Sequence, residues 1–114
     1  MRSKARNKPP GFVIAYTTAA NKADAGTIAG TLVRERLAAC VNVVPDVSSV
    51  YTWKGRSVRG KELLLIIKTR GSLLERIKKR IKSLSPYEVP EFLAVDVAYG
   101  SRDYLAWLAQ NTRP

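Results

Sequence analysis

The sequence has no histidine, and its 114 residues include a single cysteine. Without histidine, the chain lacks the commonest metal ligand and the side chain that titrates near neutral pH. A Ser-His-Asp or Cys-His mechanism is therefore excluded within one chain. One cysteine cannot form an intrachain disulfide, which fits a reducing compartment, and we expect a cytoplasmic protein.

Glycine-rich phosphate loops and long apolar runs are absent as well. With neither such a loop nor a nucleophile beside a base, the sequence predicts no enzymatic activity and no required cofactor. No segment approaches the roughly 20 apolar residues of a membrane span, so we expect no membrane association. The length and the 46% apolar content predict one folded domain.

Basic residues are in clear excess, with 20 Lys and Arg against 9 Asp and Glu and a net charge of +11. Part of this excess is local, because basic residues alternate along the first ten positions, before any apolar pattern begins. We therefore expect residues 1–10 to form a flexible basic tail and residues 11–114 to form the domain.

Apolar periodicity predicts four strands and three helices. The expected strands are 12–18, 39–53, 63–67 and 92–98. We expect the second of these to be interrupted at Pro45 by a break or a bulge, or to lie at an edge of the sheet there. Residues 54–60 read as a hairpin connection. The expected helices follow Asn21 as a cap, a capping box formed by Ser72 and Glu75, and Ser101 as a cap.

The predicted order is β-α-β-β-α-β with an extra C-terminal helix, which is the pattern of an α+β, ferredoxin-like sandwich. Right-handed crossovers would place both long helices on one face of the sheet. The strand 63–67 is apolar at every position, so it contributes apolar side chains to the other face too. A small subunit with such a face is expected to associate with copies of itself.

Five segments follow one another along the chain: Glu35 to Asn42, Val50 to Gly55, Glu62 to Thr69, Pro86-Tyr-Glu-Val-Pro-Glu91 and Tyr104 to Trp107. Together, in this order and spacing, they resemble the CutA family over roughly residues 12–112. The resemblance implies a ferredoxin-like homotrimer linked to tolerance of divalent cations, copper above all, or to small-ligand signalling at clefts between subunits. The family often has a histidine just before the Pro-Tyr-Glu motif, where this chain has Ser85.

Three residues are candidate metal ligands. Cys40 offers a thiolate suited to copper, although a cysteine in a strand is more simply a small buried apolar residue. Glu88 and Glu91 flank Val89-Pro90 and offer oxygen donors to a divalent cation, or they pair with lysines. We expect weak divalent-cation binding, with copper bound mainly through Cys40 where that thiol is accessible.

A second group of residues is expected to form a ligand cleft. Tyr51 and Trp53 share one face of their strand, where they line a pocket between subunits or pack an interface. The resemblance implies that Glu62 and Lys68, which bracket strand 63–67, meet the loop of Tyr87 at a subunit boundary. The alternative is that both are ordinary charged residues at the ends of a strand.

Three other classes share parts of this pattern. An RNA-recognition domain has the same element order, but its third strand would need aromatic residues to stack bases, and strand 63–67 has none. Nucleic-acid binding is therefore not expected, and the basic segment 76–82 is interpreted as a solvated helix face.

A PII-like regulatory trimer that binds nucleotides or anions is the main alternative, although segment 54–60 is short for the loop with which such a protein binds phosphate. An acylphosphatase-like enzyme would need a glycine in segment 17–21, which has none.

Overall fold

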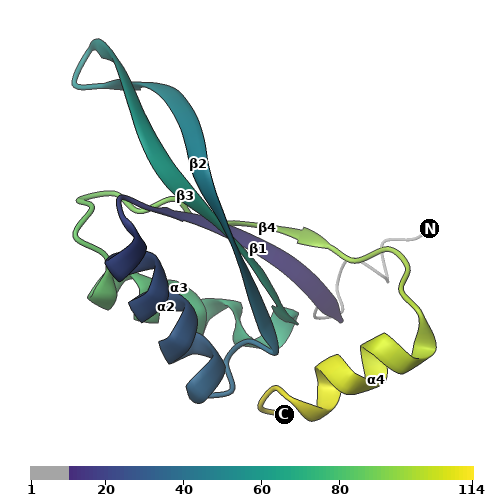
Figure 1. The fold of residues 1–114 in the computed structure, drawn as a ribbon. Coiled ribbons are helices and arrows are strands. Elements are labelled where there is room, and N and C mark those ends of the chain that lie inside the picture. The colour runs from purple at the N-terminus through teal and green to yellow at the C-terminus, as the bar shows by residue number, and fades with distance from the viewer. Residues whose placement is uncertain (1–10) are drawn as a thin grey trace.

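The computed structural model describes residues 11–114, so the expected basic tail lies outside the described residues. The elements, in chain order, are β1 (Phe12–Ala19), α2 (Lys22–Arg34), β2 (Cys40–Trp53), β3 (Arg56–Arg70), the 3-10 helix η1 (Gly71–Leu73), α3 (Leu74–Leu84), β4 (Leu93–Asp96) and α4 (Arg102–Gln110). This order confirms the predicted β-α-β-β-α-β pattern with a C-terminal helix (Figure 1).

The sheet has the strand order β2-β3-β1-β4, and all neighbouring strands are antiparallel. Helices α2 and α3 lie side by side on one face, as right-handed crossovers require (Figure 1). The hairpin of β2 and β3 projects well beyond the other strands. The fold is therefore ferredoxin-like, as predicted. In the described part of the chain, every helix is too short or too polar to cross a membrane.

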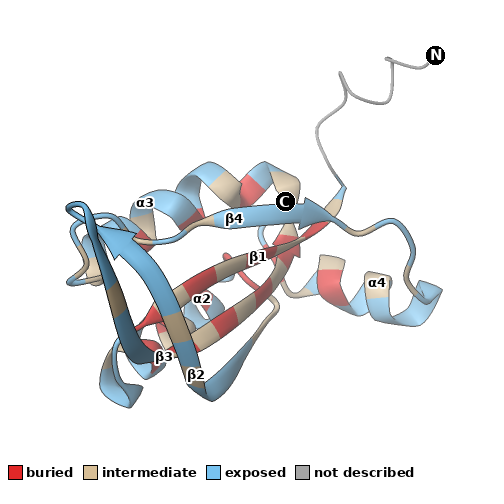
Figure 2. Cartoon of the chain, turned by 90° about the horizontal axis from the view of Figure 1, so that it is seen from above, coloured by how far each residue is buried: buried red, intermediate tan, exposed pale blue. Residues whose placement is uncertain are grey.

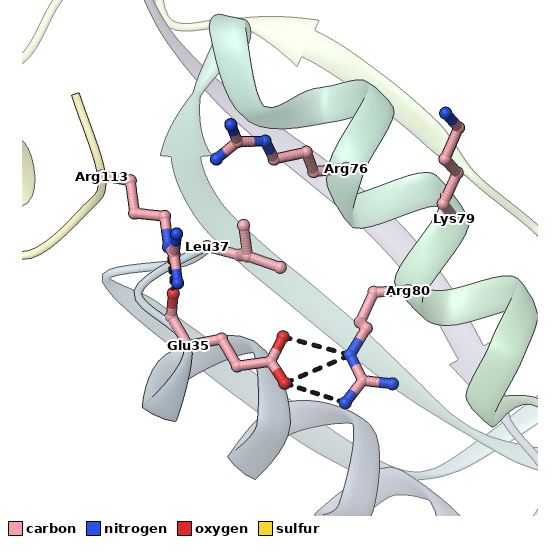
Figure 3. Close-up of a pocket in the computed structure, with 6 residues that line it drawn as sticks. All are labelled: Glu35, Leu37, Arg76, Lys79, Arg80 and Arg113. Atoms are coloured by element: carbon pink, nitrogen blue, oxygen red, sulfur yellow. Dashed lines mark hydrogen bonds and ion pairs between the residues drawn. The ribbon is translucent and has the colours of Figure 1, made fainter.

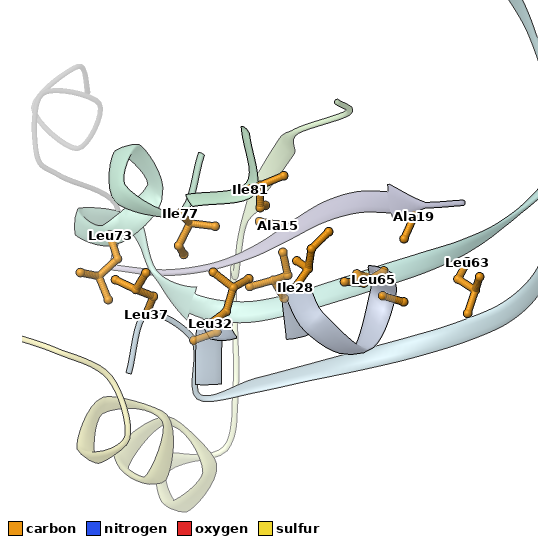
Figure 4. Close-up of a cluster of buried hydrophobic side chains, with 13 residues drawn as sticks. Ala15, Ala19, Ile28, Leu32, Leu37, Leu63, Leu65, Leu73, Ile77 and Ile81 are labelled. Carbon is orange, nitrogen blue, oxygen red and sulfur yellow. The ribbon is translucent and has the colours of Figure 1, made fainter. Parts of the chain in front are cut away.

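The core lies between the sheet and the two long helices. Side chains along β1 alternate between buried and half-buried, and the second half of β3 shows the same pattern (Figure 2). Leu63 and Leu65 point from β3 toward the helices, where Ile28 of α2 and Ile77 of α3 meet them (Figure 4). Ile67 of β3 belongs to the same buried cluster. The alternate residues Leu64 and Ile66 are only half-buried, so the opposite face of the sheet remains partly open.

The connection between β2 and β3 is shorter than predicted. Segment 54–60 was expected to be the hairpin loop, but the turn is Lys54-Gly55 alone, and Arg56 to Gly60 belong to β3. Both turn residues have positive φ, 53° at Lys54 and 77° at Gly55. A two-residue turn with this geometry matches the twist of the strands it joins, so pairing continues up to the turn.

At Pro45, β2 bulges rather than breaks. Val44 pairs with Leu64 and Val47 with Glu62, so β2 has one more residue than β3 in this interval. Asp46 takes a φ of 59°, which absorbs the extra residue. The strand is also the edge of the sheet, where a proline without an N–H is tolerated. The predicted interruption is confirmed as a bulge.

Two of the three predicted helix caps are confirmed. The Asn21 side chain accepts a hydrogen bond from the backbone N–H of Asp24, and the Ser101 hydroxyl accepts one from that of Tyr104. The capping box at Ser72 is wrong, because Gly71–Leu73 forms a 3-10 turn and neither η1 nor α3 has a side-chain cap within residues 11–114. The tight turn continues directly from β3 and shifts the start of α3 to Leu74.

We expect Ile67→Ala to lower the free energy of unfolding by about 2–5 kcal/mol, because the side chain is fully buried and its removal leaves a cavity. Val33→Ala on the exposed side of α2 is the control, with an expected change within about 0.5 kcal/mol. Urea denaturation followed by circular dichroism measures both. Equal losses in the two variants would contradict the placement of the core.

Candidate functional site

A cleft of about 680 Å³ opens between the β2–β3 hairpin and the segment that joins α3 to β4. In Figure 1 this segment lies beside the base of the hairpin. Polar and aromatic side chains of β1, β2 and β3 form one wall, and the Pro-Tyr-Glu segment forms the other. The lining residues are Thr18, Ser49, Val50, Tyr51, Trp53, Glu62 and Pro86 to Glu91.

Three hydrogen bonds fix the segment 86–91 against the body of the protein. The buried Thr17 hydroxyl of β1 donates to the backbone carbonyl of Glu91 at 2.7 Å. The Lys82 ammonium of α3 donates to the carbonyl of Glu88 at 2.6 Å. Where α3 ends, the Ser85 hydroxyl accepts from the backbone N–H of Tyr87 at 3.1 Å. With Pro86 and Pro90 restricting φ, this wall of the cleft is stiff.

The two walls are joined by a hydrogen bond between Tyr87 and Glu62. The phenol oxygen of Tyr87 donates to the Glu62 carboxylate over 2.6 Å. Partial burial raises the pKa of Tyr87 strongly, and the hydrogen bond to Glu62 raises it further. The phenol is therefore a proton donor at neutral pH, not a phenolate nucleophile or a charged metal ligand.

Glu91 is a second carboxylate of the cleft, and its pKa is shifted by its surroundings. Loss of hydration raises its pKa, and the negative charge of Glu62 adds to the effect. The pair thus concentrates negative potential in one place on a strongly basic chain. A bound cation would lower this electrostatic cost.

The aromatic residues predicted for the cleft are on its wall. Tyr51 and Trp53 line it from β2, with 45% and 38% of each residue exposed. The Lys54 ammonium lies 6.0 Å from the Trp53 ring centre. In a single chain these aromatic surfaces are available either to a ligand or to another subunit.

Two predicted site residues lie elsewhere. Lys68 and Cys40 pair with each other across β3 and β2, far from the cleft. Lys68 is six residues from Glu62 along β3, roughly 20 Å in an extended strand. Its ammonium lies 5.9 Å from the ring of Tyr104 in α4. Within one chain, the structure thus brings Tyr51, Trp53, Glu62, Tyr87, Glu88 and Glu91 together and separates Lys68 and Cys40 from them.

The residues present do not fit a tight copper site in one chain. Within residues 11–114 no three Cys, Asp or Glu side chains are grouped closely enough to hold a metal ion. Cys40 is half-buried, and its sulfur has the Asn42 amide oxygen as a neighbour at 4.0 Å. The cleft supplies oxygen donors only, which are the ligands of harder cations.

Outside the segment 86–91, three lining residues were not predicted: Thr18, Ser49 and Val50. Thr18 lies near the end of β1, opposite Leu64. Ser49 pairs with Gly60, and Val50 with Arg59. The antiparallel register of the hairpin would have placed the last two beside Glu62, but this register depends on the bulge at Pro45 and on the short turn.

The fold and this cleft define a ferredoxin-like α+β protein with an oxygen-rich cleft beside a protruding hairpin. The family model of the CutA1 divalent ion tolerance protein matches residues 13–111, and the chain belongs to this family. The resemblance seen in the sequence is thereby confirmed.

Individual relatives and solved structures support the same family assignment. A divalent-cation tolerance protein CutA from Thermus thermophilus is 52% identical over 88 residues, which are 77% of this chain and 85% of the relative. The solved structure of a divalent cation tolerance protein from the same organism superposes with a TM-score of 0.87 at 46% identity, covering 90% of this chain and 99% of that one. Rice Protein CutA 1, chloroplastic, is 44% identical over 89% of this chain, which spans 57% of that relative's length.

We expect Glu91→Gln to stabilise the protein modestly at neutral pH. The folded-state pKa of Glu91 lies above its ordinary value of 4.5, so the folded state holds this proton more tightly than the unfolded state does. Stability contributed by this group therefore falls as pH rises through the interval above 4.5. The gain of Glu91→Gln should vanish in acid, below the ordinary glutamate range.

Thermal unfolding of the wild type and of Glu91→Gln between about pH 4 and pH 8 measures the difference in stability, because carboxylates titrate in the lower part of this range. Glu88→Gln, which removes the same charge from the same segment, is the matched control. A gain for Glu91→Gln that is independent of pH would contradict the electrostatic explanation.

Proposed function

We propose that this protein serves divalent-cation tolerance as a homotrimer that binds divalent cations weakly and reversibly at the Glu62–Tyr87–Glu91 cleft. The observation that carries the proposal is the convergence of two carboxylates on one stiff cleft, with a phenol bridging its walls at 2.6 Å. Membership of a family described by divalent ion tolerance supports the choice of ligand.

The donor set indicates which cations are preferred. Glu62 and Glu91 supply carboxylate oxygens, while the protonated phenol of Tyr87 holds Glu62 in position. Such donors suit Mg²⁺, Mn²⁺ or Ca²⁺, with water completing the coordination shell. Binding is expected to be weak, because only two carboxylates meet and the chain carries a net charge of +11. Copper binds separately, at the half-buried thiol of Cys40.

Exposed apolar side chains support the trimer. Large apolar residues on β2 and β4 remain exposed, and Leu64 and Ile66 of β3 are half-buried on the open face of the sheet. The exposed residues are Val43, Val44, Val50, Leu93 and Val95. A monomer of this size would leave this surface in water, whereas packing against two copies would cover it.

The geometry favours cation binding over the PII-like alternative. A nucleotide-gripping loop would have to come from the hairpin, but Lys54-Gly55 is a two-residue turn. The cleft beside it is lined by three carboxylates, which would repel a phosphate group.

Calorimetric titration with Mn²⁺ tests the site. We expect weak binding by the wild type, a loss of about tenfold or more in Glu62→Gln and in Glu91→Gln, and no change in Cys40→Ser. Glu75→Gln, which removes a carboxylate paired with Lys78 on the outer side of α3, is the control for net charge. An equal loss in Glu75→Gln would show that the effect is not local.

Copper is titrated in the same series. Tight Cu²⁺ binding that survives Cys40→Ser would show that the ligands have been assigned wrongly. Copper binding lost in Cys40→Ser, with Mn²⁺ binding intact, is the expected result.

Sedimentation equilibrium tests the trimer. We expect a trimer at micromolar concentration and dissociation in Ile66→Glu, because this substitution places a charge on the open face of the sheet. Circular dichroism establishes that the variant is still folded. A wild-type monomer would contradict the trimer and any site shared between chains.

A further inference from the structure

A second pocket, of about 370 Å³, lies on the helical side of the molecule, away from the cleft. It is formed where the end of α2, the exposed side of α3 and the last residues of the chain meet. Its lining residues are Glu35, Leu37, Arg76, Lys79, Arg80 and Arg113 (Figure 3). Four basic side chains and one carboxylate therefore line the pocket together with Leu37.

The basic side chains on this side of α3 are crowded. Arg76 and Arg80 are four residues apart, and Arg76 and Lys79 are three apart, so they lie on one side of the helix. Like charges at these spacings destabilise a helix. Lys78, by contrast, pairs with Glu75 at 3.1 Å on the outer side. Within residues 11–114, Arg76 and Lys79 make no ion pair of their own, so only Glu35, which pairs with Arg80, offsets the positive charge of the pocket.

Glu35 occupies part of the pocket as its sole anion. Its carboxylate accepts hydrogen bonds from Arg80 at 2.8 to 3.2 Å (Figure 3). These hydrogen bonds are the main reason that the pKa of Glu35 is lowered, and they raise the pKa of Arg80. One carboxylate is thus already held by a guanidinium in the geometry that an external oxyanion would use.

The arginine at the opposite rim is held in place by the backbone. The Nε of Arg113 donates to the carbonyl of Glu35 at 2.8 Å, and its backbone N–H donates to the carbonyl of Arg36 at 2.9 Å. Its two terminal nitrogens make no hydrogen bond within the described residues. Arg76 extends from α3 over the same pocket (Figure 3). The two guanidinium groups are therefore available to one ligand from two separate elements.

We infer that this pocket binds a compact multivalent phosphate, with Arg76 and Arg113 as its principal ligands and Arg80 shared with Glu35. Guanidinium groups match phosphate oxygens in paired hydrogen bonds. The volume is near the lower end of the range for small-molecule sites, which favours a di- or oligophosphate over a larger cofactor. The ligand would neutralise the crowded side of α3 and tie α3 to the C-terminal segment.

This site is independent of the cation cleft, because the two share no lining residue. Loss of Mn²⁺ binding in the cleft variants would leave phosphate binding intact, and the converse holds as well. The two proposals can therefore fail separately.

Calorimetric titration of the full chain with inorganic pyrophosphate at fixed ionic strength tests the inference. We expect Arg76→Gln and Arg113→Gln each to weaken binding about tenfold or more, as loss of a charged hydrogen bond does. Lys78→Gln removes one positive charge from the same helix outside the pocket and should change affinity less than about twofold. Equal weakening in Lys78→Gln and Arg76→Gln would overturn the site in favour of diffuse attraction.

Glu35→Gln gives a result that a purely structural role would not. The substitution breaks an ion pair, so a structural role alone predicts only lost stability. A phosphate site predicts tighter pyrophosphate binding, because Arg80 is released and the repulsive carboxylate is gone. Unchanged or weaker binding by Glu35→Gln, with its fold retained by circular dichroism, would overturn the inference.

Two further ligands, sulfate and duplex DNA, distinguish a site for multivalent phosphate from other kinds of anion binding. Binding of pyrophosphate but not of sulfate at the same concentration supports a site for multivalent phosphate. Binding of duplex DNA with no competition from pyrophosphate would overturn the proposal and assign the basic surface to nucleic acid.

Discussion

The architecture of the cleft depends on the unequal lengths of the strands that pair with β3. Strand β3 has 15 residues and pairs with β2 along its length, whereas β1 has 8 and pairs only from Leu63 onward. Glu62 is therefore the first residue of β3 beyond the end of β1, and the space that β1 leaves open is where the segment after α3 fits. The hydrogen bond from Tyr87 to Glu62 is made there, where β1 has already ended opposite Leu63.

Acidic and basic side chains gather in two different regions of this basic protein. Three of the nine acidic residues line one cleft, whereas the pocket between α3 and the C-terminal segment has four basic residues against Glu35 alone. At physiological ionic strength, exposed charges interact over about 8 Å. Each region can therefore attract an ion of opposite sign despite the net charge of the chain. In the proposed cation site, repulsion from distant lysines and arginines would therefore reduce affinity without abolishing it.

Much of the fold could be predicted from the sequence because it is determined by short segments of neighbouring residues. The alternation in 12–18, the caps at Asn21 and Ser101 and the proline at position 45 each report on their immediate neighbours. The loop between β2 and β3 was predicted too long, because the sequence Lys54-Gly55 does not indicate that the lysine takes a positive φ. The capping box failed because a 3-10 turn, driven by the exit from β3, took the place of the first helical turn.

The candidate site was less accessible to prediction, because its contacts join residues far apart in the chain. Resemblance to a family, not spacing, implied that Glu62 meets the loop of Tyr87 at a subunit boundary, and the structure has a contact between them within one chain. The hydrogen bond from Thr17 to the carbonyl of Glu91 joins residues 74 positions apart, and no periodicity reports it. The second pocket combines Glu35, Arg80 and Arg113, which come together only when α2, α3 and the C-terminal segment pack.

Ser85 shows how a single position bears on the chemistry of the cleft. The CutA family often has an imidazole at this place, which would offer a borderline ligand to copper or zinc. Here the hydroxyl accepts the backbone N–H of Tyr87 and helps to end α3, so the side chain serves the backbone. The adjoining donors are then oxygen atoms alone, those of Glu62, Tyr87 and Glu91. If the proposed cation site is correct, a chain that keeps the stiff Pro-Tyr-Glu wall without the imidazole would prefer harder ions.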